Sequence, residues 1–199
     1  MAYLLLLPLL FALARLKTGR YVFSALTTVS AGLIALTNLT STASVLIACA
    51  LFVSALGDYF MAHRFGDDRT YVFGIGGFFV GHALLIASAA TRLTFSPMAL
   101  VVGALLCGLY AAFLKLHVAS GLPQALKLPA AAYTLISVAG FTLSLMTGDV
   151  IYACALALLL FSDTMIAEAD FAGNRRADRL VLPTYYLCHI LVALSTILM

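Results

Sequence analysis

Four ionisable side chains stand inside long apolar stretches of this chain: Asp58, His82, Asp163 and His189. A charge or an imidazole is costly inside a membrane-spanning segment, and such residues commonly mark functional sites. Two carboxyl groups in an apolar setting can hold different protonation states, so that one donates a proton while the other accepts one. Asp58 and Asp163 are therefore the candidate catalytic pair, and His82 is the candidate group that orients the acid.

Helical spacing places polar partners beside two of these residues. Ser54 lies one turn before Asp58, and Tyr185 and Tyr186 lie one turn before His189. Side chains three or four residues apart meet on one face of a helix, so a tyrosine hydroxyl could orient the His189 imidazole. Each residue alone could also serve only in packing, because a buried histidine or aspartate is often simply hydrogen-bonded within a core.

The elements that carry these residues must be membrane helices. Of the 199 residues, 64% are hydrophobic and only 10% are charged, and the mean hydropathy is +1.11. This composition excludes a soluble enzyme and a nucleic-acid-binding domain. A spanning helix needs about 20 apolar residues, and we expect an all-α fold in which residues 1–199 form one integral membrane domain, a bundle of eight transmembrane helices. The eight apolar segments are 2–16, 22–37, 43–62, 71–90, 95–114, 127–146, 150–169 and 181–198.

The basic residues alternate between the linkers of this predicted bundle. All of the 11 lysines and arginines except Arg92 fall in the odd-numbered linkers. Since basic residues concentrate in cytoplasmic loops, we predict that both termini lie on the non-cytoplasmic side of a membrane of the bacterial inner-membrane type. Counted from the segment ends, Asp58, His82, Asp163 and His189 then fall in the cytoplasmic half of the bundle.

Short motifs around these residues occur in a recognisable order. They are Ser54-Ala55-Leu56-Gly57-Asp58, then Phe73-Gly74 through Phe78 to Gly81-His82, Pro129 to Tyr133, Phe161-Ser162-Asp163, and Tyr185-Tyr186. In this order and spacing, from about residue 15 to 195, the chain resembles the YhhN-like transmembrane lysoplasmalogenases. His189 is a departure, because many members of that family are expected to carry glutamine there.

The resemblance implies hydrolysis of the vinyl ether bond of lysoplasmalogens, which gives a fatty aldehyde and a glycerophospho-ethanolamine or -choline. It implies no cofactor and no metal, with a lysophospholipid substrate and membrane lipids as partners and no nucleic acid. The oligomeric state stays open. Asp58 and Asp163 would be acid and base, as in glycosidases, which form a similar cation. The predicted substrate-binding residues are Ser54, Tyr133, Ser162, Tyr185, Tyr186 and His189, with Arg64 as a phosphate ligand unless it only marks topology.

Two expectations concern geometry. The carboxyl groups of Asp58 and Asp163 should approach within bridging distance of one water, because both lie at similar depth. A pocket that is closed toward the far side and lined by apolar helix faces, including Phe78 and Phe79, should accept a single hydrocarbon chain.

Three other kinds of protein remain possible from the residues. A metal-dependent lipid hydrolase would hold zinc with Asp58, His82, Asp163 and His189. A lipid transporter or lipid-binding protein would use the aspartates to relay protons. An intramembrane aspartyl protease also uses two aspartates, but its Gly-x-Gly-Asp motif is absent because Ala55 stands at the first glycine position.

Overall fold

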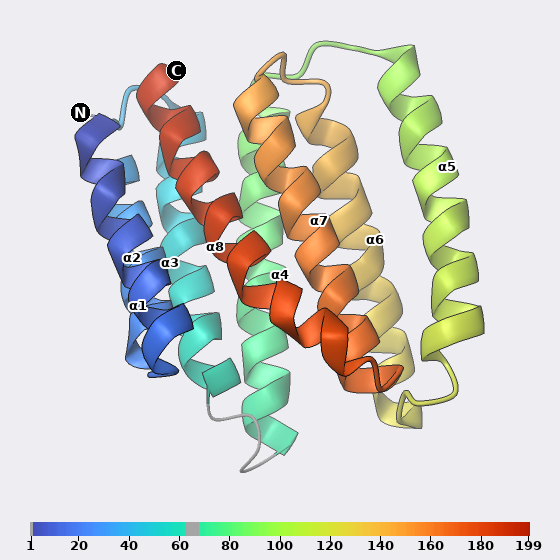
Figure 1. Cartoon of the computed structure of the whole chain (residues 1–199). Coiled ribbons are helices and arrows are strands. Elements are labelled where there is room, and N and C mark those ends of the chain that lie inside the picture. Colours follow the sequence, from blue (N-terminus) through green and yellow to red (C-terminus); the bar gives the residue numbers. More distant parts are fainter. Residues whose placement is uncertain (1, 63–67) are drawn as a thin grey trace.

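A computed structural model describes residues 2–62 and 68–199, which form an all-helical protein. The predicted all-α fold and its eight helices are confirmed in this part of the chain (Figure 1). Short 3-10 segments precede α1 and α6, and a π-helical turn follows α5. The elements are η1 (Ala2–Leu5), α1 (Leu6–Thr18), α2 (Val22–Leu36), α3 (Thr42–Ala62), α4 (Asp68–Ala90), α5 (Pro97–Phe113), η2 (Leu114–Val118), η3 (Gln124–Leu126), α6 (Lys127–Ser144), α7 (Val150–Phe171) and α8 (Arg175–Leu198).

Six of these helices are long and apolar enough to cross a membrane, which makes the chain an integral membrane protein. They are α3, α4, α5 with η2, α6 with η3, α7 and α8. Helix α2 is apolar but has only 15 residues, a length of roughly 22 Å against about 30 Å of hydrocarbon. Helix α1 has 13 residues, and η1 extends it toward the N-terminus.

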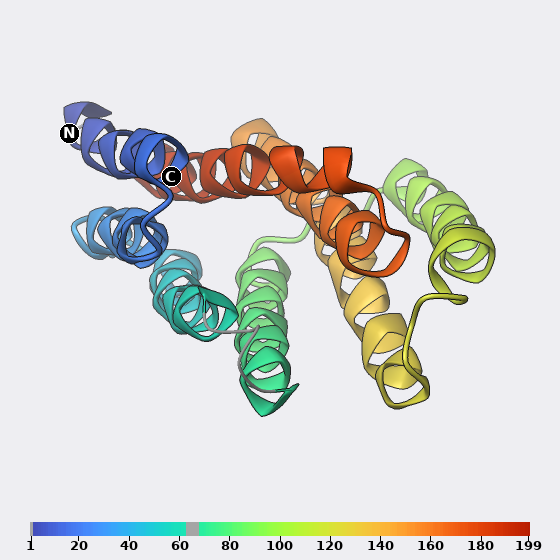
Figure 2. The same cartoon turned by 60° about the horizontal axis from the view of Figure 1, so that its bottom comes forward.

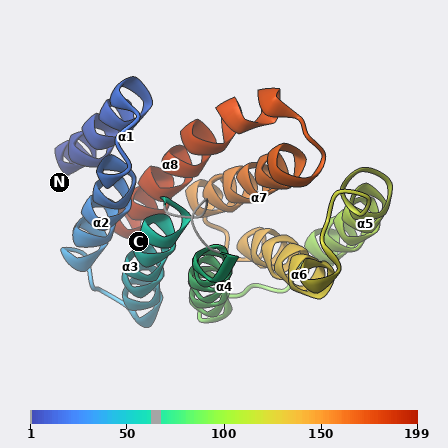
Figure 3. The same ribbon diagram turned by 90° about the horizontal axis from the view of Figure 1, so that it is seen from below.

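The helices run antiparallel to their sequence neighbours, and both termini lie at the same end of the bundle (Figure 1). Viewed along the helices, α7 and α8 lie across from α3, α4 and α6 (Figure 3). Helices α1 and α2 close one edge beside α8, whereas α5 lies at the opposite edge and packs mainly on α6 (Figures 2 and 3). The polar residues discussed below lie between these two layers.

Helix α8 begins at Arg175, six residues before the predicted segment that starts at residue 181. The first turns of α8 are polar, so hydropathy does not mark them as part of a membrane segment. They are helical, and Asn174 caps their N-terminus. The Asn174 side chain accepts a hydrogen bond from the Arg176 backbone N–H at 3.2 Å. The basic residues assigned to this linker therefore lie on a helix that extends past its apolar part.

Glycines bring α3 and α4 close together, as their small-xxx-small spacing suggests. A Cβ atom added to Gly77 would lie 3.1 Å from Cα of Gly57, and one added to Gly81 would lie 2.6 Å from Oγ of Ser54. The contact lies within one bundle, so these two glycines serve in helix packing. Larger side chains at Gly77 or Gly81 would push Asp58 and His82 apart.

Arg92, the basic residue outside the charge pattern, forms part of a polar cluster at the terminal end of the bundle. Its guanidinium donates to Asp149 Oδ2 at 3.0 Å and lies 4.6 Å from the centre of the Tyr152 ring. Asp149 also accepts hydrogen bonds from the Ser195 hydroxyl at 2.7 Å and the Tyr152 backbone N–H at 2.9 Å. One carboxylate therefore joins the ends of α4, α7 and α8.

Replacement of Asp149 by asparagine should destabilise the fold by about 1–2 kcal/mol, because the negative charge that strengthens the hydrogen bonds from Arg92 and Ser195 is lost. Burial alone would raise the pKa of Asp149, but these hydrogen bonds, that from Tyr152 and the Arg92 charge together lower it below its ordinary value. The stabilisation is therefore complete above the unfolded value near 3.9 and is lost as pH falls through the lower folded value.

Thermal unfolding in detergent at several pH values would measure this effect. The wild type should lose stability on acidification below about pH 4 more steeply than Asp149→Asn does. Ser195→Ala, which removes one donor and keeps the ion pair, should cost less than Asp149→Asn. Equal melting temperatures for the wild type and Asp149→Asn at neutral pH would contradict the account.

Candidate active site

Two adjacent cavities lie between the helix layers in the half of the bundle away from the termini. The polar cavity has about 1150 Å³ of unfilled space, part of it open to the outside. Its walls carry most of the ionisable residues singled out in the sequence, together with Arg15 and Asp178. Its polar lining residues are Arg15, Tyr21, Ser24, Ser54, Asp58, His82, Tyr133, Asp163, Asp178, Tyr185 and His189.

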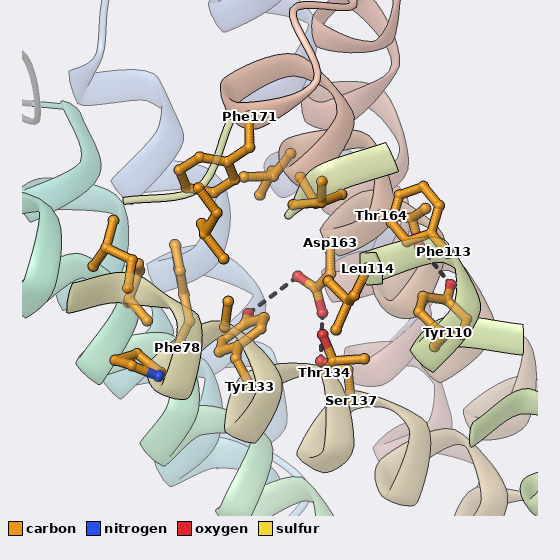
Figure 4. Close-up of a pocket in the computed structure, with 18 of the residues that line it drawn as sticks. Phe78, Tyr110, Phe113, Leu114, Tyr133, Thr134, Ser137, Asp163, Thr164 and Phe171 are labelled. Carbon is orange, nitrogen blue, oxygen red and sulfur yellow. Dashed lines mark hydrogen bonds between the residues drawn. The ribbon is translucent and has the colours of Figure 1, made fainter. Parts of the chain in front are cut away.

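Asp163 is the most heavily hydrogen-bonded carboxyl group in the cavity wall. Tyr133 donates its hydroxyl to Oδ1 at 3.1 Å, and Ser137 donates its hydroxyl to Oδ2 at 2.8 Å, both from α6 (Figure 4). Nε2 of His82 on α4 lies 3.1 Å from Oδ2. Three side chains from α4 and α6 thus fix the position of the Asp163 carboxyl group on α7.

The hydrogen bonds of His82 locate a proton. Its Nδ1 lies 2.8 Å from the Phe78 carbonyl oxygen, which can only accept, so Nδ1 carries hydrogen. Nε2 then either accepts a hydrogen bond from a protonated Asp163 or, if the imidazole is charged, donates one to an ionised Asp163. In both forms a single proton lies between His82 and Asp163. The His82 side chain is shielded from solvent, since only 4% of its surface is exposed.

Asp58 also lines the polar cavity, with hydrogen-bond partners separate from those of Asp163. The Thr28 hydroxyl of α2 donates to its Oδ2 at 2.6 Å. The buried Tyr185 hydroxyl lies beside the Asp58 carboxyl and the Thr28 hydroxyl, although it completes no well-aligned hydrogen bond with a described residue. Asp58 and Asp163 thus face one cavity from α3 and α7, and their sharing of one water stays a prediction.

His189 and the two tyrosines of α8 are arranged differently from the simple phenol–imidazole contact expected. Nδ1 of His189 lies 2.8 Å from the Tyr185 carbonyl oxygen and therefore donates a hydrogen bond to the backbone. Nε2 takes no part in this hydrogen bond. The Tyr185 ring packs on the imidazole with a centroid distance of 4.2 Å. Tyr186 does not line the polar cavity, and its hydroxyl shares a 2.6 Å hydrogen bond with Ser24.

The remaining predicted site residues fall into different places. Ser54 lines the polar cavity as expected. Ser162 is buried and donates to the Val181 carbonyl oxygen at 3.1 Å, so it ties α7 to α8 and lines neither cavity. Phe78 lines both cavities, whereas Phe79 points outward with 38% of its surface exposed. Arg64 lies outside the described residues.

Arg15 is a charged residue of the polar cavity that sequence reasoning missed. It lines the polar cavity from α1, donates from Nε to the Ser24 hydroxyl at 3.2 Å, and lies 4.7 Å from the centre of the Tyr21 ring. Among the described residues it forms no ion pair with a carboxylate. Its place in a basic linker hid it, since every linker arginine fits the topology pattern equally well.

The apolar cavity, which shares a wall with the polar one, has about 810 Å³ of unfilled space. Met61, Phe78, Tyr133, Asp163 and Ile166 line both cavities. The rest of its lining comes from α4, α5, α6, α7 and the segment from η2 to η3, and it is mainly aliphatic or aromatic, as Figure 4 shows around Asp163. Asp163 and Tyr133 thus stand at the junction between a polar and an apolar space.

The described residues contain no group of three or more His, Cys, Asp and Glu side chains arranged to hold a metal ion. Asp58, His82, Asp163 and His189 line one cavity, but in the described part of the chain the four side chains considered from the sequence as zinc ligands are not arranged as a metal-binding group.

Comparison with known proteins gives one match. A family model described as the YhhN family matches residues 19–196, which is most of the chain and includes all four ionisable residues of the predicted spans. No curated protein and no solved structure matches the chain.

Proposed function

The chain belongs to the YhhN family, and from that premise we propose that it is a membrane-embedded hydrolase of lysoplasmalogen-type lysophospholipids. It cleaves the vinyl ether bond and releases a fatty aldehyde and a glycerophospho-headgroup. The observation that carries the proposal is the 3.1 Å contact between His82 Nε2 and Asp163 Oδ2 at the junction of a polar and an apolar cavity. A vinyl ether stands at the same junction in its lipid, between the polar glycerol and the hydrocarbon chain.

In the first step the His82–Asp163 pair gives its proton to the alkene carbon distal to the ether oxygen. The π-electron pair forms the new C–H bond, and the positive charge passes to the carbon–oxygen unit as an oxocarbenium ion. The pair is left with one proton fewer and one additional negative charge close to this cation, which lowers its energy. Tyr133, already directed at Asp163, keeps the carboxyl group in place.

In the second step a water attacks the oxocarbenium carbon and passes a proton to Asp58, the second carboxyl group of the polar cavity. The resulting hemiacetal then gives its hydroxyl proton back to the His82–Asp163 pair. Its carbon–oxygen bond to glycerol breaks, and the glycerol oxygen takes the proton held by Asp58, so that both groups return to their starting protonation states. One water is consumed, and the aldehyde and the alcohol leave. Separate hydrogen-bond partners allow Asp58 and Asp163 to hold different protonation states.

Arg15 is proposed to bind the lipid phosphate, the role considered for Arg64 from the sequence. It is the arginine that lines the polar cavity among the described residues, and a guanidinium suits a phosphate well. Arg15→Gln should raise KM for the lysophospholipid roughly tenfold and change kcat little, because the phosphate contact is equally present in ground and transition states.

The matched control for this test is Arg20→Gln, since Arg20 is exposed nearby and lines neither cavity. Steady-state rates of aldehyde release over a range of substrate concentrations would separate the two parameters. A KM for Arg15→Gln equal to that of Arg20→Gln would remove Arg15 from headgroup binding.

The basic residues support a proposed orientation. The odd-numbered linkers carry these basic residues, and the helix ends that they join lie at the end of the bundle opposite the two termini (Figure 1). By the positive-inside rule, the proposed orientation has both termini on the non-cytoplasmic side and both cavities in the cytoplasmic half. The site would then draw its lysolipid from the cytoplasmic leaflet of a membrane of the bacterial inner-membrane type.

The proposed reaction is tested with purified protein and two lipids that differ only in their chain linkage, a 1-alkenyl and a 1-acyl lysophospholipid. Aldehyde release from the alkenyl lipid alone supports the proposal. Fatty acid release from the acyl lipid would favour another kind of hydrolase. Loss of activity with a chelator would favour a metal-dependent enzyme, and binding without cleavage would favour a lipid transporter.

A further inference from the structure

We propose that the apolar cavity between α4, α5, α6 and α7 holds the hydrocarbon chain of the substrate, so that the lipid is divided between two cavities at Asp163. This inference rests on the proposed function for the identity of the lipid. It assigns a binding site, and a direction for the chain, that the reaction itself does not determine.

The chemistry of the cavity wall favours an apolar occupant over a polar one. Asp163 is the one charged residue among its described lining residues. Several of the hydroxyl groups are already used within the wall: Tyr110 and Thr164 hydrogen-bond to each other, and Tyr133 and Ser137 donate to Asp163 (Figure 4). A headgroup would find few free partners there, whereas a hydrocarbon chain needs none.

The π-helical turn η2, which directly follows α5, contributes to this space. Leu114 and Val118, at its two ends, both line the apolar cavity. A π-helical turn changes the direction of successive side chains relative to a regular α-helix. The chain of the lipid would thus run from Asp163 between α6 and α7 toward α5, the helix at the edge of the bundle.

The polar cavity offers the complementary half of the site. Arg15 and Asp178 bring opposite charges to its walls, and among the described residues they do not form an ion pair with each other. Because Met61, Phe78, Tyr133, Asp163 and Ile166 line both spaces, an amphiphile with its headgroup near Arg15 reaches the apolar cavity past Asp163. Its polar–apolar junction then lies at the proton donor.

The test uses a saturated 1-O-alkyl lysophospholipid, which cannot be hydrolysed by vinyl ether chemistry, with a photoreactive diazirine at the end of its chain. After irradiation of the full-length protein in nanodiscs, mass spectrometry should locate the label on residues of the apolar cavity, such as Leu114, Val118 and Ala130. Excess unlabelled alkyl lysophospholipid should remove this labelling, and excess diacyl phospholipid should not. Labelling of α1, α2 or the polar-cavity part of α8, or labelling that the lysolipid does not displace, would overturn the proposal.

A pair of alanines on α6 provides a matched comparison. Ala130 lines the apolar cavity, whereas Ala132 is exposed and lines neither cavity. Ala130→Phe should lower both the labelling yield and kcat/KM for a long-chain alkenyl substrate by about tenfold, because the added ring occupies chain volume. A short-chain substrate should be much less affected, and Ala132→Phe should resemble the wild type. Should Ala130→Phe fail to fold, Thr134→Leu tests the same wall.

The two hypotheses fail in different ways. If the wild type releases no aldehyde but the label falls on the apolar cavity, the proposed reaction is wrong and the chain site stands. If aldehyde is released and the displaced label lies elsewhere, the reaction stands and the chain site is wrong.

Discussion

Replacement of Asp163 by asparagine should lower the rate of vinyl ether cleavage by roughly 10²-fold or more, because the group that shares a proton with His82 is lost. Asparagine keeps the shape of the side chain and an oxygen that can accept from Tyr133 or Ser137. The protein should therefore stay folded, which a thermal unfolding measurement would verify. The rate is measured as initial aldehyde release at saturating substrate.

Glu168→Gln is the matched control on the same helix, since Glu168 lines neither cavity and contacts Asn174 at its end. It should retain nearly full activity. Near-normal turnover of Asp163→Asn would show that this carboxyl group serves packing, and the proton-donor role would have to be abandoned.

Asp58→Asn should cause a comparable loss, roughly 10²-fold in kcat, because the attacking water then has no carboxylate to accept its proton. Thr28→Ala should reduce the rate less, about tenfold, since it removes the 2.6 Å hydrogen bond that positions Asp58 and leaves the base itself in place.

The double variant of Asp58 and Asp163 supplies a further readout. Two residues that act in one reaction sequence should give a loss much smaller than the product of the single losses. Multiplicative losses, or full activity of Asp58→Asn, would separate Asp58 from the chemistry.

The helices and their polar residues could be predicted because membrane burial makes polar groups conspicuous. Asp58, His82, Asp163 and His189 stood out against an apolar background, and all four line the polar cavity. The eight apolar segments likewise correspond to the eight helices of the described chain. Physically, each of these features depends on local composition alone.

The features that could not be predicted depend on partners far away in the sequence. The contact between His82 and Asp163 joins residues 81 positions apart, and helical spacing carries no information about it. Ser162 lies next to Asp163 but turns toward the Val181 carbonyl oxygen, because neighbouring residues on a helix point about 100° apart. The place of Arg15 in the cavity could not be predicted, because the sequence does not show which of the linker arginines faces the cavity.

Helix α8 illustrates a different limit. The sequence predicts a linker where its first two turns lie, because these turns are polar and hydropathy identifies only the part of a helix that lies in lipid. The extension from Arg175 carries Asp178, which lines the polar cavity. The apolar boundary of a span therefore hid a residue of the candidate site.

The central claim, that this protein donates a proton to the alkene carbon of a vinyl ether, is tested most directly by carrying out the reaction in D2O. The aldehyde released from a 1-alkenyl lysophospholipid is reduced at once with borohydride and analysed by mass spectrometry. The account predicts one deuterium at carbon 2 of the former aldehyde, with product formation strongly reduced in Asp163→Asn. An aldehyde without deuterium at carbon 2, or labelled aldehyde formed equally fast by Asp163→Asn, would contradict it.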